Sequence, residues 1–232
     1  MLAYVRFSDA LAFPSQSFAS LFSLPPGKRS IILPPAANES QPAGLNGRED
    51  LLLYTGNGRT SRYGVDILVE AVDRARHEIP HIALHLIATP EERPPARILA
   101  DRPWITLKHL RTDEIPFELP NVRAVVIPFR AIDYHQVALP FKLMDYLSYG
   151  RPMLVTRCRE IARFVEENRL GLVVDDNPES MADGIRRLFT ADLDELNRMG
   201  QNALRAVREK HSWRHRAQQI LDTFEEIRQR DA

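Results

Sequence analysis

A run of glycines and arginines, GNGRTSRYG at residues 56–64, is the first segment whose residues could bind an anionic ligand. Gly56 and Gly58 would let the backbone approach an anion closely, and the guanidinium groups of Arg59 and Arg62 match phosphate oxygens. The spacing is not that of a Walker loop, and the dinucleotide-binding pattern fails because serine stands where its third glycine belongs. The segment therefore fits either a diphosphate cradle or a polar turn with solvated arginines.

A second candidate group lies in LPFKLMDYLSYG, residues 139–150. Pro140 suits the first turn of a helix, and Lys142 and Asp145, three residues apart, would share one helix face. A lysine there can meet phosphate charge, and a carboxylate can accept hydrogen bonds from ribose hydroxyls, as acidic residues do in other nucleotide sites. The same two residues also fit a surface ion pair worth only about 0.3–0.5 kcal/mol.

Alternating apolar runs and helical patterns from residue 51 onward must position both groups. Strands are expected at 51–56, 81–88, 104–110, 122–129, 152–156 and 171–175, and helices at about 64–77, 91–100, 140–149, 159–168, 178–189, 192–209 and 212–229. The strands lack polar alternation, which is typical of a parallel sheet covered on both faces. The expected fold class is α/β, a doubly wound, Rossmann-like, six-stranded parallel sheet. Ligands of such sheets bind at the carboxyl ends of the strands, so functional residues should follow the first, fourth and fifth strands.

The segment before this pattern has a different composition. It contains an apolar stretch at 10–13, a short helical candidate at 15–22, another apolar stretch at 31–33 between two proline pairs, and a linker-like segment at 36–49. This part cannot close a core alone. We therefore expect a partial unit with its linker at 1–49 and a Rossmann-like domain at 50–232.

The composition excludes several classes of function. The 232 residues carry 31 basic and 31 acidic side chains, so no general charge attracts nucleic acid or an anionic membrane. A single cysteine, Cys158, excludes an internal disulfide framework, and the seven histidines show no metal-ligand spacing. Apolar runs stay far below the roughly 20 residues of a membrane span, and charges interrupt the first 13 residues too often for a signal peptide. A cytoplasmic location without a bound metal is the resulting expectation.

Taken together, several segments carry a family resemblance. LYTGNGRTSRYGVDILVEAV, VVIPF, LPFKLMDYLSYGRPMLVT and GLVVDDNPESMADGIRRL follow one another in an order and spacing that resemble the donor-binding domain of retaining GT-B glycosyltransferases, the large "group 1" family. HSWRHRAQQIL resembles that family's closing helix, so the likeness covers about 51–225. It implies a nucleoside diphosphate sugar as donor, an acceptor of unknown chemistry, retention of configuration and no cofactor.

The resemblance also implies roles for single residues. Arg59 matches the family's diphosphate-binding arginine, and Tyr63 stands where a lysine usually does, so Arg62 or Lys142 would supply that charge. Asp145 matches the ribose-binding acid, whereas the glutamate that contacts the sugar falls on Val137. The predicted site has Arg59 and Lys142 as catalytic residues and, as substrate-binding residues, Gly56, Gly58, Arg62, Asp133, His135, Pro140 and Asp145, with Asp133 and His135 as polar substitutes for the glutamate.

Residues 8–22 resemble the last strand and helix of that family's N-terminal domain, and 24–36 its crossing segment. The remainder of that domain has no counterpart in the sequence, so this remnant would expose apolar surface that a partner chain or dimer mate could cover. Two alternatives to transfer by this chain stay open. One is a non-catalytic nucleotide-binding or assembly module that pairs with a partner chain, and the other is a sugar-nucleotide epimerase of the same fold.

Overall fold

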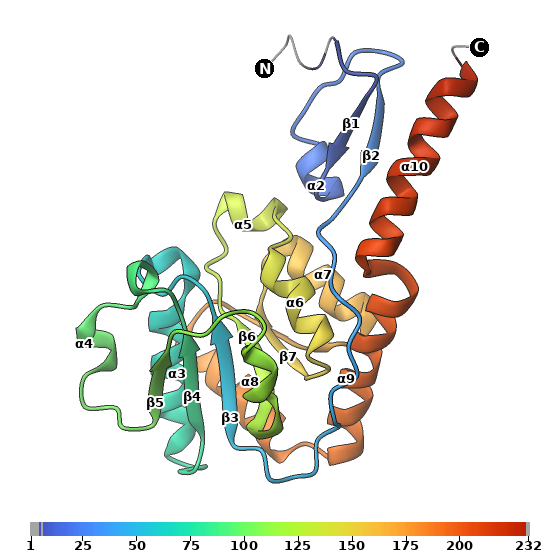
Figure 1. Ribbon diagram of the computed structural model, residues 1–232. Coiled ribbons are helices and arrows are strands. Elements are labelled where there is room, and N and C mark those ends of the chain that lie inside the picture. The colour runs from blue at the N-terminus through green and yellow to red at the C-terminus, as the bar shows by residue number, and fades with distance from the viewer. Residues whose placement is uncertain (1–4, 6, 231–232) are drawn as a thin grey trace.

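A six-stranded parallel sheet forms the centre of the computed structural model, which describes residue 5 and residues 7–230 (Figure 1). Its strand order is β5-β4-β3-β6-β7-β8, and every neighbouring pair is parallel. The strands are β3 (Leu51–Thr55), β4 (Ala83–Ile87), β5 (Ile105–Lys108), β6 (Val122–Ile127), β7 (Met153–Thr156) and β8 (Gly171–Val174). The predicted doubly wound α/β fold is confirmed, with the reversal of strand order between β3 and β6.

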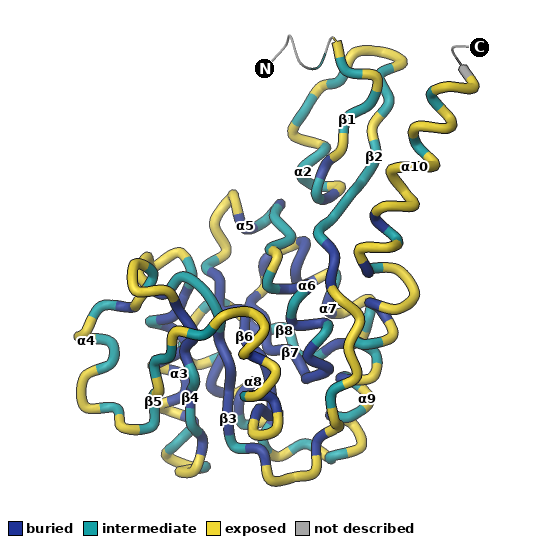
Figure 2. Tube along the Cα trace, viewed as in Figure 1, coloured by how far each residue is buried: buried dark blue, intermediate teal, exposed yellow. Residues whose placement is uncertain are grey.

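Helices cover both faces of this sheet. On one face α3 (Val65–Arg76) and α8 (Pro178–Thr190) pack over side chains such as Leu52 and Val126; on the other, α6 (Phe141–Ser148) and α7 (Arg159–Asn168) pack over Leu53 and Val125. Every residue of β6 and β7 is buried, and Figure 2 shows these strands in dark blue. Burial on both faces explains why the strands read as continuous apolar runs.

The connections differ from the expected helices in two places. The helix expected at 91–100 is reduced to a 3₁₀ turn at Pro90–Glu92 and a single turn, α4 (Ala96–Leu99), because the two prolines at 94–95 interrupt the segment. A short helix that the sequence pattern did not indicate, α5 (Asp133–Val137), lies between β6 and α6. The long connection from β5 to β6 contains only 3₁₀ turns, at Ile115–Phe117 and Leu119–Asn121.

The N-terminal segment forms a small unit outside the main sheet. Strand β1 (Ala10–Phe13) pairs in parallel with strand β2 (Arg29–Ile32), and the short helix α2 (Gln16–Ala19) lies in the connection between them. Within the segment 24–36, expected to be a crossing segment, residues 29–32 form β2, and the β-branched pair at 31–32 favours this extended conformation beside β1. Of the expected first unit, residues 1–4 and 6 lie outside the described residues, as do 231–232 of the second.

The C-terminal helices carry the chain back to this N-terminal unit. Helix α9 (Leu193–Ala206) continues through one π-helical turn (Val207–His211) into α10 (Trp213–Arg230), which lies beside β2 in Figure 1. The backbone N–H of Ala37 donates to the carbonyl of His211, and Arg29 of β2 forms an ion pair with Glu226. In the described part of the chain, no helix combines the length and the apolar character that a membrane span needs.

Candidate functional site

The two predicted groups meet at the carboxyl edge of the sheet. The loop 56–64 follows β3, and the segment 128–140 that leads to α6 follows β6, so both lie where the strand order reverses. Gly64 holds the two together: its φ is +67°, and a Cβ on it would lie 1.6 Å from the carbonyl oxygen of Pro128. The fold therefore places the glycine–arginine loop and the start of α6 side by side.

The other two glycines of the loop are used for close packing. The N–H of Gly56 donates to the carbonyl of Ile87 at 2.7 Å, and that of Gly58 donates to the carbonyl of Glu92 at 2.8 Å. A Cβ on Gly56 would lie 3.0 Å from Nζ of Lys142, and one on Gly58 would lie 3.1 Å from Cδ of Pro94. Their amides are thus engaged inside the protein, and the absence of side chains is what brings Lys142 against the loop.

The arginines of the loop are exposed. Asn57 fixes the turn, because its Oδ1 accepts hydrogen bonds from the backbone N–H groups of Arg59 and Thr60 at 2.9 and 3.3 Å. Arg62 donates from Nη2 to the hydroxyl of Tyr63 at 3.0 Å. Both guanidinium groups are open to solvent, and neither arginine lines the cavity described below, whereas Tyr63 does.

Lys142, in the first turn of α6, points back toward the end of β3. Its Nζ donates to the carbonyl of Thr55 at 2.6 Å and lies 4.1 Å from the ring centre of Tyr54 and 5.1 Å from that of Phe129. Burial lowers the pKa of Lys142 to about 7, and the carboxylate of Glu92 opposes this only in part. The site thus contains a desolvated ammonium group beside the place where an anionic ligand is expected to bind.

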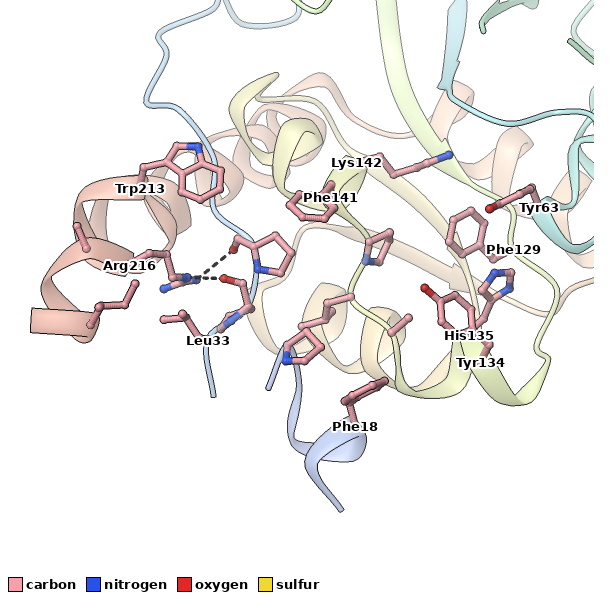
Figure 3. Close-up of a pocket in the computed structure, with 18 residues that line it drawn as sticks. Phe18, Leu33, Tyr63, Phe129, Tyr134, His135, Phe141, Lys142, Trp213 and Arg216 are labelled. Carbon is pink, nitrogen blue, oxygen red and sulfur yellow. Dashed lines mark hydrogen bonds between the residues drawn. The ribbon is translucent and has the colours of Figure 1, made fainter. Parts of the chain in front are cut away.

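A cavity of about 760 Å³ opens beside this lysine (Figure 3). Apolar side chains and prolines form most of its wall, and polar groups gather at the end where Tyr63, His135 and Lys142 lie. Pro140 also lines it, whereas Asp133 is exposed on α5 and is not among the lining residues. At the far end Arg216 donates to the carbonyl oxygens of Pro34 and Lys210.

Asp145 lies in a different hollow. One turn after Lys142 along α6, it lines a second cavity of about 780 Å³ together with Asn38, Ser40, Arg111, Thr112, Asp113, Pro116, Ser148 and Tyr149. Burial raises the pKa of Asp145. Helix α6 therefore presents Lys142 to the apolar cavity and Asp145 to the polar one, although three-residue spacing alone placed them on a common face.

His135 and Val137 are both buried on α5, but they contact different parts of the protein. The imidazole of His135 is buried, is stacked on Phe129 with ring centres 4.4 Å apart, and has Nδ1 2.8 Å from the carbonyl oxygen of Arg130. Val137 is buried as well, and its carbonyl accepts a hydrogen bond from the hydroxyl of Ser15. The structure thus brings His135, Lys142 and Pro140 to one cavity and leaves Asp133 outside it.

Several neighbours of these residues escaped the sequence analysis. Tyr54 and Phe129, whose rings surround the ammonium group of Lys142, read as core aromatics at strand ends, and Arg111 and Asn38 lie in loops without a motif. The position of Tyr54 and Phe129 at the ends of the first and fourth strands was the available signal. Within the described residues, acidic, histidine and cysteine side chains form no group of three that could hold a metal.

Solved structures show the same fold. Sucrose-phosphate synthase from Thermosynechococcus elongatus matches 97% of this chain at 18% identity and a TM-score of 0.75. A UDP-forming trehalose-phosphate synthase from Burkholderia vietnamiensis matches 99% at 13% identity and a TM-score of 0.71, and a pneumococcal O-GlcNAc transferase, GtfA, solved with UDP and GlcNAc, matches 94% at 14% identity and a TM-score of 0.73. The chain spans 60%, 63% and 45% of the lengths of these three chains.

Sequence comparison identifies the family. No curated protein sequence matches this chain. The profile of one protein family, "Glycosyl transferases group 1", matches residues 49–191, which cover the sheet from β3 to β8, the loop 56–64 and helix α6. This chain belongs to the group 1 family of glycosyltransferases.

Proposed function

We propose that this chain is the donor-binding part of a glycosyltransferase that transfers a sugar from a nucleoside diphosphate sugar with retention of configuration. The observation that carries the proposal is the ammonium group of Lys142, held against Gly56 between the ends of β3 and β6. A desolvated cation is costly without an anionic partner, and a diphosphate is the anion that the family's substrates carry. The UDP bound in one solved relative of this fold agrees with such a ligand.

The nucleoside would lie in the polar cavity. The carboxylate of Asp145 would accept hydrogen bonds from the ribose hydroxyls, and the side chains of Arg111, Thr112 and Asn38 would surround the base. Asp145 and Lys142 lie on the same helix, one turn apart. A nucleoside at Asp145 would have to extend its diphosphate along α6, from the polar cavity to the apolar one, to reach Lys142.

The basic residues would stabilise the leaving diphosphate. When the bond between the anomeric carbon and the phosphate oxygen breaks, negative charge develops on that oxygen, and Lys142, Arg59 and Arg62 would stabilise it from two sides. The free N–H groups in the first turn of α6 would add to this effect. Among the described residues we assign no side-chain nucleophile, so the acceptor hydroxyl would attack the anomeric carbon on the face that the diphosphate leaves, and its proton would pass to the departing phosphate oxygen.

Binding calorimetry with UDP, GDP and ADP tests this proposal. The full chain should bind one of the three, Asp145→Ala should weaken that binding about tenfold or more through loss of the ribose contact, and Asp133→Ala, outside both cavities, should leave it unchanged. If none of the three nucleotides binds, or if both variants bind like the unmodified chain, the assignment is wrong.

One observation favours a second function, that of a binding or assembly module. A parallel pair as small as β1 and β2 is not stable alone, and Leu21, Leu221 and Phe224 are exposed near it. These features are consistent with another protein domain or chain that packs beside α10. Intact nucleotide binding without turnover of any donor by the purified chain, together with a partner that restores transfer, would favour this role.

A further inference from the structure

The imidazole of His135, a residue that lines the cavity beside Lys142, has a buried ring nitrogen without a hydrogen-bond partner among the described residues. The side chain is 1% exposed, and its ring is among the residues that line the cavity. Nδ1 lies 2.8 Å from the carbonyl oxygen of Arg130, and since a carbonyl can only accept, Nδ1 carries the proton and Nε2 carries a lone pair. Within the described residues Nε2 is buried without a partner. An orphaned buried acceptor is costly to folding and therefore indicates a role with a ligand.

The orientation of this ring is fixed from several sides. It is stacked on Phe129 at an interplanar angle of 24°, and the ring centre of Tyr63 lies 5.9 Å away. Phe129 follows β6 and Tyr63 belongs to the loop after β3, so the ring is anchored to the ends of both strands (Figure 3). A lone pair held in this way has a defined direction, which is what selective recognition of a ligand atom requires.

The chemistry of the surroundings narrows the choice of ligand atom. The predicted diphosphate-binding groups, Arg59, Arg62 and Lys142, can only donate hydrogen bonds. Burial, together with the positive charges of Arg62 and Lys142, lowers the pKa of His135, so the imidazole stays neutral near pH 7. A neutral Nε2 repels a phosphate oxygen, which is itself an acceptor, but accepts a hydrogen bond from a hydroxyl. Val137, two residues later, offers an apolar side chain that cannot do this.

We propose that Nε2 of His135 accepts a hydrogen bond from a hydroxyl group of the sugar carried by the nucleoside diphosphate and thereby contributes to the choice of donor sugar. This inference rests on the proposed function. Tyr63 and Tyr134 adjoin the imidazole and line the same cavity, so the sugar reaches Nε2 past one of these rings. Tyr134 is 62% exposed and has room to move.

Two substitutions of the same residue separate the two ring nitrogens. In His135→Asn the amide nitrogen takes the place of Nδ1 and keeps the hydrogen bond to Arg130, but no atom reaches the position of Nε2. In His135→Gln the amide oxygen lies near the position of Nε2. Calorimetry on the full chain would compare UDP, GDP and ADP with UDP-glucose, UDP-N-acetylglucosamine, GDP-mannose and ADP-glucose, after circular dichroism has shown that each variant is folded.

We expect His135→Asn to bind the free nucleoside diphosphate within about twofold of the unmodified chain and the matching nucleotide sugar about tenfold more weakly, and His135→Gln to recover most of this loss. Among donors that each lack one hydroxyl, one should bind the unmodified chain and His135→Asn equally. Equal weakening of nucleotide and nucleotide sugar, or no weakening of either, would overturn the role of His135 while leaving the proposed function in place. Failure of the unmodified chain to bind any of the nucleotides would reject both.

Discussion

At the scale of single residues, Lys142 shows how a tertiary environment changes a common side chain. The local sequence fits either a phosphate-binding lysine or a surface ion pair at the start of a helix. In the fold, the ammonium group lies between Tyr54 and Phe129, with the Thr55 carbonyl as hydrogen-bond acceptor. Burial disfavours the charged form and lowers the pKa to about 7. An anion beside Nζ would reverse this effect, because it favours the charged form.

This reversal predicts proton uptake when a nucleoside diphosphate binds. With a pKa of about 7 in the free protein, Lys142 is mostly neutral at pH 8, and a bound diphosphate raises the pKa so that roughly 0.9 proton is taken up at that pH. At pH 6 the lysine is already protonated, and the uptake by this group disappears. Calorimetric binding enthalpies measured in buffers of different ionisation enthalpy report the number of protons.

The control for this prediction is Lys142→Met, which keeps a side chain of similar length without a titratable group. This variant should lose the proton uptake at pH 8, along with part of its affinity. Uptake that persists in Lys142→Met would assign the proton to another group.

At the scale of elements, the packing contact between the loop 56–64 and the end of β6 decides whether the site assembles. Gly64 has a positive φ and no room for a side chain, because a Cβ would overlap the Pro128 carbonyl. Both the start of α3 and the direction of segment 128–140 depend on this close approach. The sequence identifies Gly64 as a loop residue, but it does not show that Gly64 packs against Pro128.

Substitution of Gly64 by alanine should therefore be severe. We expect Gly64→Ala to lower the free energy of unfolding by at least about 3 kcal/mol, since strain at positive φ adds to a steric overlap. Gly27→Ala is the matched control: Gly27 has a φ of +79° and nothing within 4 Å of the place that a Cβ would take, so only the conformational cost of about 1–2 kcal/mol remains. Urea unfolding measures both. Equal losses would show that the contact with Pro128 does not matter.

At the scale of the whole molecule, segments near the two ends of the chain pack together although they are far apart in sequence. Arg216 on α10 is buried and donates to the carbonyl oxygens of Pro34 and Lys210 and to Oε1 of Gln219. The hydroxyl of Ser15 reaches Val137 on α5. These contacts attach the N-terminal unit to the cavity wall, so this unit takes part in shaping the candidate site.

Removal of the Arg216 guanidinium should loosen this attachment. Arg216→Ala leaves the carbonyl oxygens of Pro34 and Lys210 without this donor, and we expect a loss of about 2 kcal/mol in the free energy of unfolding together with faster amide hydrogen exchange at Ala37. Arg214→Ala, an exposed position two residues earlier on the same helix, serves as the control and should change neither quantity. Unchanged exchange at Ala37 in Arg216→Ala would show that the N-terminal segment is attached by other contacts.

The six strands, their parallel arrangement and the edge of the sheet at which the candidate site lies could be predicted from the sequence alone. Strands buried on both faces leave continuous apolar runs, and parallel strands end at a common edge. Contacts in the folded chain, by contrast, show that Lys142 and Asp145 line different cavities and that the glycine amides already have hydrogen-bond partners. They also show that Nε2 of His135 lacks a partner among the described residues. These properties depend on contacts between residues distant in sequence, and local spacing contains no information on what a side chain meets across the fold.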